Sequence, residues 1–488
     1  MKFRISRRLA LRGAAGAALA AALPRAARSQ SDARASQTEA DLTGRLARYM
    51  ADARTRALPE RVVVAAKQRI LDTLAAIVSG SRLAPGKLAI DYVRTLGGTA
   101  EACVATTSIV TTAVDAAFAN AMCAHADETD DFHPLTKAHP GCAVVPAALA
   151  MAERERASGA ALISAVVLGY DVCCRFLMAL GPDAVRASEQ SAEGVSSTFG
   201  AAAAAASIAG FDERRMRFAI SYAAQQASGV WSWERDEEHV EKAFDFAGMG
   251  VRNGVMGATL IAAGFTGVAD ALDAPPNVFR AHSPRPSPEE IVAGLGTRFY
   301  VEETAIKTFP VGYPIQAPLT AFLRLRERHG FDPEEVRHIT LRLPADGAKI
   351  VDNSAMPDVN VQHIIAVALL DRRITFENSH ARERLTDARV LAVRERIELV
   401  ADPALVDAAA PRSGLVEVTL TDGQKLRELV KHAPGTPENP LDTAGVNAKA
   451  RELIAPVLGS ERAETLIARI GALERIPDMR ELRPLLMS

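Results

Sequence analysis

Apolar residues recur at helical spacing along much of the chain. Val63, Ile70, Leu74 and Ile77 are separated by seven, four and three residues, which places them on one face of a helix. The same kind of periodicity continues over residues 41 to about 305. This part of the chain is therefore predicted to be helical almost throughout.

Capping signals mark the ends of several of these helices. Pro140 opens a helical run over residues 141–156, where a proline in the first turn costs nothing because its missing N–H would be unpaired in any case. Asp212 is the predicted N-cap of the helix that follows Gly210. Gly200 leads into six alanines, and either close packing on several sides or simple helix preference explains that run.

After Lys307 the pattern changes, and apolar residues alternate with polar ones in two segments. Strands are predicted there, the second of them followed by an Asp422-Gly423 turn. Between the two strands, residues 361–370 and 381–396 are predicted to be helices. The alternating positions are Ile339, Leu341, Leu343, Val416, Val418 and Leu420.

Beyond a proline-rich linker, helical periodicity returns in residues 444–458 and 461–473. The predicted fold is therefore mainly α, with a large all-helical domain and a smaller α+β domain inserted before the C-terminal helices. The helical domain is expected to cover residues 40–305 plus 440–488, and the α+β domain residues 306–436.

Composition excludes several classes of protein. The chain has 488 residues, of which 48% are hydrophobic and 24% charged, so disorder is excluded for most of its length. Basic and acidic residues number 57 and 59 and nearly cancel, which argues against an electrostatically driven nucleic-acid binder. Five cysteines without a CxxC pair disfavour a disulfide framework or a structural zinc site. No GxGxxG or Walker sequence is present to bind phosphates.

Residues 1–30 have the features of an export signal. Basic residues precede a short apolar run, and Ala26-Ala27 offers a small-residue cleavage site. The segment Ser6-Arg7-Arg8 is typical of a twin-arginine signal, so a periplasmic mature protein without a membrane segment is expected. The alternative is an uncleaved basic tail on a cytoplasmic protein.

One window concentrates the groups that could carry chemistry. It holds three of the ten histidines and four carboxylates. If the preceding helix continues from Val114 to about Glu128, His125 and Glu128 lie on one face. Pro140 puts His139 in a loop just before a helix N-terminus, where backbone N–H groups favour an anion. The window comprises His125, Asp127, Glu128, Asp130, Asp131, His133 and His139.

Three interpretations of this window stay open on the residues alone. It is a solvated polar loop, an acid/base site for proton transfer, or a metal site, since His and Asp are suitable ligands. No HExxH or EF-hand pattern supports the metal interpretation, and no metal is expected.

The window and several later blocks resemble the MmgE/PrpD family over about residues 40–485. The segment from Asn120 to His133, followed by His139 to Ala147, is similar to the family signature. The other blocks appear in the family order. They are Leu71–Leu74, Gly169–Val172, Gly200 with its alanines, Lys242–Gly248, Arg252–Val255, Ala263–Gly267, Lys307–Pro310 and Gln362–Leu370.

The resemblance implies a function as well as a fold. The family includes 2-methylcitrate dehydratase, cis-aconitate decarboxylase and an iminodisuccinate epimerase. It implies a homodimer that acts on polycarboxylates without a metal, flavin or nucleotide cofactor. Its chemistry moves a proton next to a carboxylate, with dehydration, decarboxylation or epimerisation. This requires a base, an acid and cations for the substrate charges.

Carried over position by position, the resemblance gives a set of expected site residues. His139 is the expected general acid/base, oriented by Glu128 and Asp131, with His363 as a second proton carrier. Lys242 is expected in the catalytic set as a carboxylate-binding cation. The expected substrate-binding residues are Lys307, Arg252, Asp130, His133 and Gln316.

The chain also departs from the family pattern. Residues 191–199 contain no histidine where known members carry one, and Val311 to Gln316 lack the His or Cys that often follows the Lys307 block. These losses put 2-methylcitrate itself in doubt as the substrate. They also support an alternative function, an exported carboxylate-binding protein that has lost catalysis.

Overall fold

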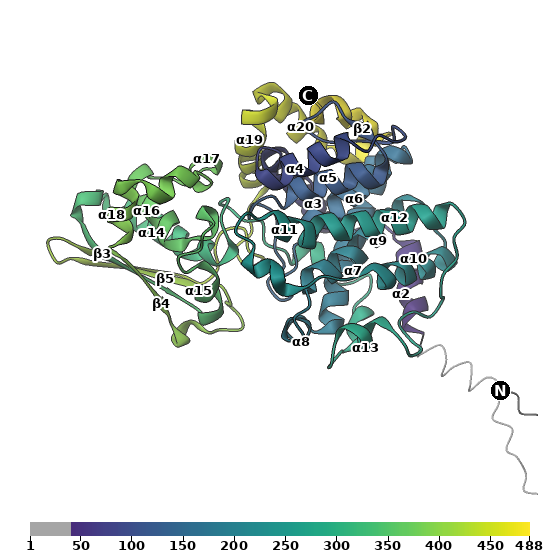
Figure 1. Ribbon diagram of the computed structural model, residues 1–488, viewed down its shortest axis with the longest axis horizontal. Coiled ribbons are helices and arrows are strands. Elements are labelled where there is room, and N and C mark those ends of the chain that lie inside the picture. The colour runs from purple at the N-terminus through teal and green to yellow at the C-terminus, as the bar shows by residue number, and fades with distance from the viewer. Residues whose placement is uncertain (1–40) are drawn as a thin grey trace, which may run out of the picture. The chain divides into compact units, whose positions relative to one another are not determined.

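The computed structural model describes residues 41–488 of the protein (Figure 1). The export signal predicted for residues 1–30 lies outside this part of the chain. The described residues are mostly helical, with one four-stranded sheet and one short two-stranded ribbon. The prediction of a mainly α fold with a small α+β region before the C-terminal helices is confirmed.

Helices dominate the chain up to residue 282, with the ribbon of β1 (Ala102–Cys103) and β2 (Val110–Thr111) between them. Their apolar faces build one continuous hydrophobic core. In chain order the helices are α2 (Leu42–Asp52), α3 (Glu60–Gly80), α4 (Ala84–Arg94), α5 (Ala113–Ala124), α6 (Pro140–Arg154), α7 (Gly159–Leu180), α8 (Pro182–Ala187), α9 (Ala192–Ile208), α10 (Glu213–Gln226), α11 (Val240–Ala243), α12 (Met249–Ala262) and α13 (Val278–His282).

The alanine-rich helix α9 lies at the centre of this core. All of its residues are buried, and it packs against α6, α7, α10 and α12. Small side chains permit these close approaches: a Cβ added at Gly254 of α12 would meet the backbone N of Ala202 at 2.5 Å. Of the two explanations for the alanine run, close packing on several sides is the one that the structure bears out.

A second hydrophobic core lies around the four-stranded sheet, whose strand order is β4-β3-β5-β6. Strand β3 pairs in parallel with β4 and antiparallel with β5, and β5 and β6 form a hairpin at the predicted turn, where Gly423 has φ 93°. Helices α14 and α16 pack against the sheet. The elements are α14 (Tyr313–His329), β3 (Val336–Leu343), α15 (Ala345–Val351), α16 (Val361–Asp371), α17 (Phe376–Ser379), α18 (Ala388–Arg394), β4 (Ile397–Ala401), β5 (Gly414–Leu420) and β6 (Lys425–Val430).

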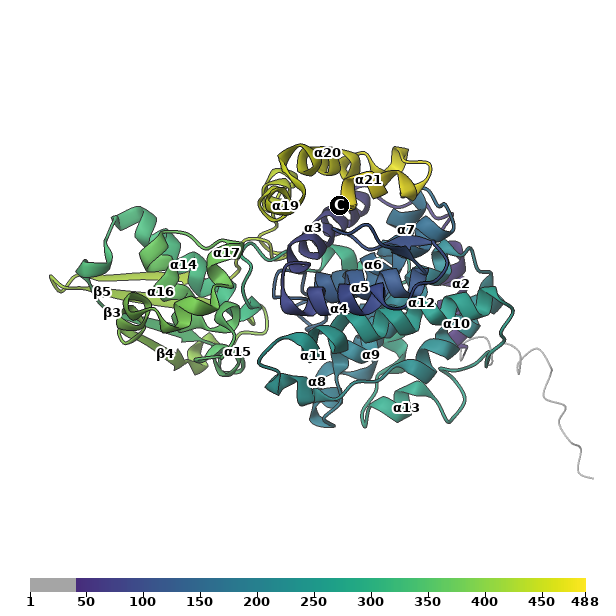
Figure 2. The same cartoon turned by 45° about the horizontal axis from the view of Figure 1, so that its top comes forward.

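The C-terminal helices return to the first core. Helix α19 (Thr443–Leu458) packs along α3, and α20 (Ser460–Gly471) and α21 (Arg483–Leu486) follow it (Figure 2). A buried ion pair joins Lys449 Nζ of α19 to Asp72 Oδ1 of α3 at 2.6 Å. The chain therefore closes its first core with residues more than 370 positions apart in sequence.

Two of the predicted helices end differently in the structure. The helix expected to reach Glu128 stops at Ala124, so His125 is its C-cap residue. Asp127 accepts a hydrogen bond from the backbone N of Thr129, a local turn that competes with helix formation. The helix expected over 381–396 is divided, because Asp387 caps α18 and leaves only a short 3-10 turn before it.

Helix α7 is also long and apolar enough, by length and composition, to cross a membrane. Within the described residues it is the one helix that meets this criterion, and 83% of its most apolar window is buried against other helices. Such burial is typical of the central core helix of a globular domain.

The packing around α9 gives a first prediction. We expect Gly254→Ala to lower the free energy of unfolding by about 1–3 kcal/mol, because the added methyl group meets the backbone of α9. Urea unfolding measures the change. Gly471→Ala, at the end of α20 with open space around the Cα, is the matched control. Equal stabilities of the two variants would contradict this account of α9.

Candidate active site

The loop between α5 and α6, residues 125–139, carries most of the polar groups of the site. Most of its side chains are buried even though it lacks regular structure, and Asp130 is completely buried, while Leu135 is exposed. Lys449 Nζ donates a hydrogen bond to the backbone carbonyl of Thr129 at 2.8 Å, so α19 holds the loop from behind. Buried polar groups need such partners, and the loop is therefore fixed by the fold around it.

Asp130 lies at the centre of a cluster of buried polar groups. The cluster consists of His125, Glu128, Asp130, His139, Lys242 and Lys307. The Asp130 carboxylate is 2.9 Å from His125 Nδ1 and 3.1 Å from His139 Nδ1. Lys307 Nζ lies 3.5 Å from the same carboxylate. One carboxylate thus orients two imidazole rings and leaves the Nε2 atom of each ring available for other partners.

Glu128 forms the second carboxylate centre. Lys242 Nζ donates to one of its oxygens, and Lys307 Nζ lies 3.1 Å from the other. Lys242 comes from α11, far along the chain, and Lys307 from the segment that joins the two hydrophobic cores. The two lysines expected to bind carboxylates are therefore both in the cluster, where they now bind a carboxylate of the protein itself.

The charges explain why these groups stay ionised when buried. Burial alone would raise the pKa of Glu128, but Lys242 and Lys307 outweigh it and hold that pKa well below its usual value. Burial is likewise outweighed at Asp130, whose pKa His125, His139 and Lys307 lower. The charges of the two carboxylates and the two ammonium groups cancel. Protonation of an imidazole would therefore make the cluster cationic and favour an anionic ligand.

Aromatic rings close one side of the cluster. Phe246 stacks on His125 with ring centroids 4.6 Å apart and meets His139 edge-on at 5.3 Å. Phe132 meets His139 edge-on as well and stacks on Tyr313. This apolar wall limits water at the imidazoles and strengthens their electrostatic interactions.

A hollow of about 420 Å³ lies beside the cluster. His239, next to Glu128 and His125, lines it together with Asp127. Residues of the sheet region, Asp358 and His380 among them, line it as well. His239 therefore lies between this hollow and the buried groups around Asp130 and Glu128, which do not line it themselves.

His380 lies between two carboxylates at the wall of this hollow. Its Nε2 is 3.1 Å from Asp127 and 3.9 Å from Asp358. Burial would lower the pKa of His380, but its hydrogen bond and charge contact with Asp127, with the charge of Asp358, raise it to about 9. A protonated His380 therefore links the loop of residues 125–139 to the sheet region.

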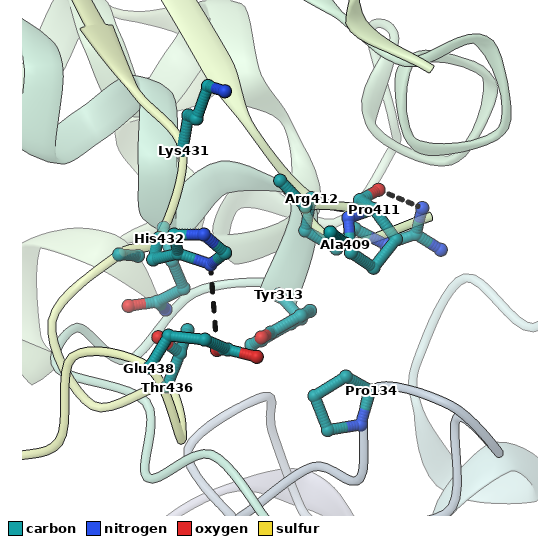
Figure 3. A pocket seen from close by; sticks show the side chains of 12 residues that line it. Pro134, Tyr313, Ala409, Pro411, Arg412, Lys431, His432, Thr436 and Glu438 are labelled. Carbon is teal, nitrogen blue, oxygen red and sulfur yellow. Dashed lines mark hydrogen bonds and ion pairs between the residues drawn. The ribbon is translucent and has the colours of Figure 1, made fainter. Parts of the chain in front are cut away.

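A second hollow, of about 350 Å³, lies beyond the Phe132–Tyr313 stack (Figure 3). Tyr313 and Pro134 face it, and His432 lies 3.5 Å from Glu438 across it. None of the imidazole, carboxylate or lysine groups of the cluster lines this hollow.

Among residues 41–488, two sets of side chains have ligand atoms close enough together to hold a metal ion. His125, Glu128 and His239 present ligand atoms within 4.8 Å of one another, as do His125, Asp130 and Cys142. The first set shares its carboxylate with two ammonium groups, which oppose a cation at that position. The cluster is therefore better suited to an anion than to a metal ion.

Of two neighbouring aspartates among the expected residues, Asp130 and not Asp131 is the one that contacts His139. Asp130, expected to bind substrate, is the carboxylate that orients His139, and Asp131 instead accepts a hydrogen bond from the backbone N of Gly141 at the start of α6. Burial and the charge of Asp130 raise the pKa of Asp131 to about 6. Glu128 does not contact His139 directly but is held by the lysines.

His133 and Gln316 are used structurally. His133 Nδ1 lies 2.7 Å from Thr136 Oγ1 within the loop. Gln316 donates to the backbone carbonyls of Phe309 and Val311 and accepts from the N–H groups of Thr308 and Phe309, which fixes the turn after Lys307. These hydrogen bonds give both side chains a positioning role, and their expected role in substrate binding stays a prediction.

Arg252 and His363 do not join the cluster. Arg252 is exposed on α12, and its guanidinium donates to the neighbouring Asn253. His363 is buried on α16 in the sheet region, where burial and nearby Arg394 lower its pKa to about 4. The structure does not bring either side chain into the cluster, and their expected functional roles stay predictions.

Sequence reasoning missed His239 and the pair of His380 with Asp127. His239 stands three residues before Lys242, and this proximity was the one available signal. His380 lies more than 250 residues from Asp127, and nothing in the local pattern joins them. His125 was visible in the histidine-rich window but received no role.

The position of His380 gives a pH-dependent prediction. Its folded-state pKa of about 9 lies above the ordinary 6.5, so its stabilising effect is complete below pH 6.5 and is lost as the pH rises through 9. We expect His380→Gln to lower the free energy of unfolding by about 3 kcal/mol at pH 6, a difference that shrinks by pH 10. Urea unfolding across this range measures it, with exposed His338→Gln as control. A pH-independent difference would contradict the ion-pair account.

Comparison with known proteins relates the chain to one family over both of its regions. The model of the MmgE/PrpD N-terminal domain matches residues 44–291, and that of the MmgE/PrpD C-terminal domain matches residues 309–474. A cis-aconitate decarboxylase of Aspergillus terreus (strain NIH 2624 / FGSC A1156) is 23% identical over 486 residues, covering 92% of this chain and 97% of the relative. A cis-aconitate decarboxylase-like protein, oryM, of Aspergillus oryzae is 23% identical over 496 residues, covering 92% and 98%.

The matches place both regions of the chain in one family and relate it to lyase-type enzymes over nearly its whole described length. The residues of the cluster lie within the span of the N-terminal model, except Lys307, which lies between the two matched spans. On this evidence the chain belongs to the MmgE/PrpD family.

Proposed function

We propose that this protein is a cofactor-independent lyase or isomerase that moves a proton next to a carboxylate of a polycarboxylate substrate. The observation that carries the proposal is the Asp130 carboxylate held between His125 and His139, with Lys307 beside it. Imidazoles oriented by a carboxylate in a buried site are suited to proton transfer near neutral pH.

The lysines supply the second requirement, a site for substrate charge. Lys242 Nζ is partly accessible, with 13% of its side chain exposed, whereas that of Lys307 is buried. A substrate carboxylate entering from the hollow would meet Lys242 first and share it with Glu128. Positive charge placed there also stabilises the enediolate-like charge that develops when the neighbouring C–H bond breaks.

Proton removal is followed by expulsion of a neighbouring hydroxyl as water, or by return of the proton to the other face. In a decarboxylation the C–C bond breaks to release carbon dioxide, and the electron pair left on carbon takes a proton from the same acid. A cis-aconitate decarboxylase and a cis-aconitate decarboxylase-like protein among the relatives support the lyase branch. A dehydratase similar to 2-methylcitrate dehydratase is the version we propose first. The residues needed for the proton step are the same in each case.

A second candidate is a carboxylate-binding protein without turnover. It is motivated by the absence of histidine from residues 191–199. Calorimetric binding of citrate, 2-methylcitrate or cis-aconitate with no turnover and no solvent-deuterium exchange would favour it. Turnover or exchange with any of the three compounds would favour the enzyme, and activity that survives exhaustive chelation would support independence from metal.

The central residue of the proposal can be tested by substitution. We expect His139→Ala to lower turnover of the best of these three substrates by about 10²- to 10⁴-fold, because the imidazole oriented by Asp130 is lost. Product formation followed by NMR measures the effect, and exposed His338→Ala is the control. Turnover within threefold of the unaltered protein would rule out the assigned role of His139.

A further inference from the structure

His239 is a buried histidine without a hydrogen-bond partner. Only 4% of its surface is exposed, and neither ring nitrogen finds a partner among residues 41–488. Buried polar atoms are almost always paired, so an imidazole with both nitrogens free requires an explanation. A partner that binds from outside the chain is one such explanation.

The backbone of His239 adds a second, independent observation. Its φ of 64° lies in the left-handed region, which a residue other than glycine rarely adopts. Residues with this backbone conformation are found often at functional sites, where the surrounding structure fixes the direction of a side chain. The segment before α11 thus directs His239 inward and not toward solvent.

His239 faces both the cluster and the hollow. Its ring centroid is 5.2 Å from that of His125, whose own Nε2 atom is also unpartnered among the described residues. It forms part of the lining of the 420 Å³ hollow. The charged groups around it are Glu128, Asp130, Lys242 and His125 of the cluster, and Asp127, Glu238, Asp358, His380 and Arg382 of the hollow.

We propose that His239 is a second catalytic residue, the base that takes the proton from the substrate carbon, while His139 is the acid that completes the reaction. This inference rests on the proposed function and assigns the direction of proton movement in the same site. His239 lines the hollow, and His139 is held by Asp130. The ring centroid of His125 is 4.9 Å from that of His139 and 5.2 Å from that of His239.

His239 and His139 together account for every proton and electron pair that moves in the proposed reaction. An unprotonated nitrogen of His239 accepts the hydrogen as H⁺, and the C–H electron pair forms the new carbon–carbon double bond. In a dehydration the C–O bond breaks toward oxygen, and the leaving hydroxide takes the Nε2 proton of His139 and departs as water. His239 then releases its proton to solvent through the hollow, and His139 regains one, so no oxidant or co-reactant is needed.

The electrostatic surroundings suit this division. Burial, then Lys242 and His125, lower the pKa of His239 well below its ordinary value, so the ring is neutral and able to accept a proton. Asp130, 3.1 Å from His139 Nδ1, fixes the orientation of that ring. The two imidazoles thus have different surroundings, one held by a carboxylate and one without a hydrogen-bond partner among residues 41–488.

Two substitutions at the same position test the proposal. Asparagine and glycine both tolerate a positive φ, so His239→Asn and His239→Gly are expected to keep the fold, which circular dichroism and the thermal midpoint check. We expect each to lower turnover and solvent-deuterium exchange of citrate, 2-methylcitrate and cis-aconitate by about 10²-fold or more. Because His239 adjoins the hollow, added imidazole is expected to restore part of the activity of His239→Gly but not of His239→Asn.

The controls separate this inference from the proposed function. His282→Gly, at a half-buried histidine of α13 outside the cluster, is expected to retain activity and to show no response to imidazole. An active unaltered protein whose His239 variants keep turnover within threefold would overturn the role of His239 and leave the function standing. No turnover or exchange by the unaltered protein would overturn both. Activity abolished by chelation and restored by a divalent metal would make His239 a ligand and also overturn the proposal.

Discussion

The buried ammonium group of Lys307 is the constraint on which the site depends. Its side chain is inaccessible to solvent, and among residues 41–488 the carboxylates that it contacts are those of Glu128 and Asp130. Leaving such a charge unpaired would cost several kcal/mol, so the loop that carries both carboxylates must fold against the segment that carries the lysine. Lys307 lies between the segments that enter the two hydrophobic cores. Its ion pairs therefore form only when the chain around both cores has folded, and the same ion pairs position the site.

The same loop is held from several directions, which explains how an irregular segment can be precise. Lys449 of α19 binds the carbonyl of Thr129, and Asp131 binds the first turn of α6. His380 reaches Asp127 from the sheet region. Each contact comes from a different part of the chain, and together they position the imidazoles without using their Nε2 atoms. Such support from surrounding residues is what a proton-transfer site requires.

Local patterns predicted most of the fold, because burial of helix faces and strand alternation are local signals. The six alanines of α9, the Asp212 cap and the hairpin at Gly423 all have physical causes that lie within a few residues. The site was predictable only as a set of candidates. Which of Asp130 and Asp131 meets His139, and whether Arg252 or His363 points inward, depends on tertiary packing that one sequence does not contain. His239 lies beside His125 in the structure, and its only sequence signal was its position three residues before Lys242.

The central claim is that the buried cluster binds a substrate carboxylate and places the reacting carbon beside the imidazoles. A crystal structure of the protein with citrate bound tests it most directly. We expect a citrate carboxylate on Lys242 and the carbon chain beside His139 and His239, with citrate entering from the hollow that His239 lines. Citrate bound instead in the hollow beyond Tyr313, with the cluster unchanged, would contradict it, as would a divalent metal ion held by His125, Glu128 and His239.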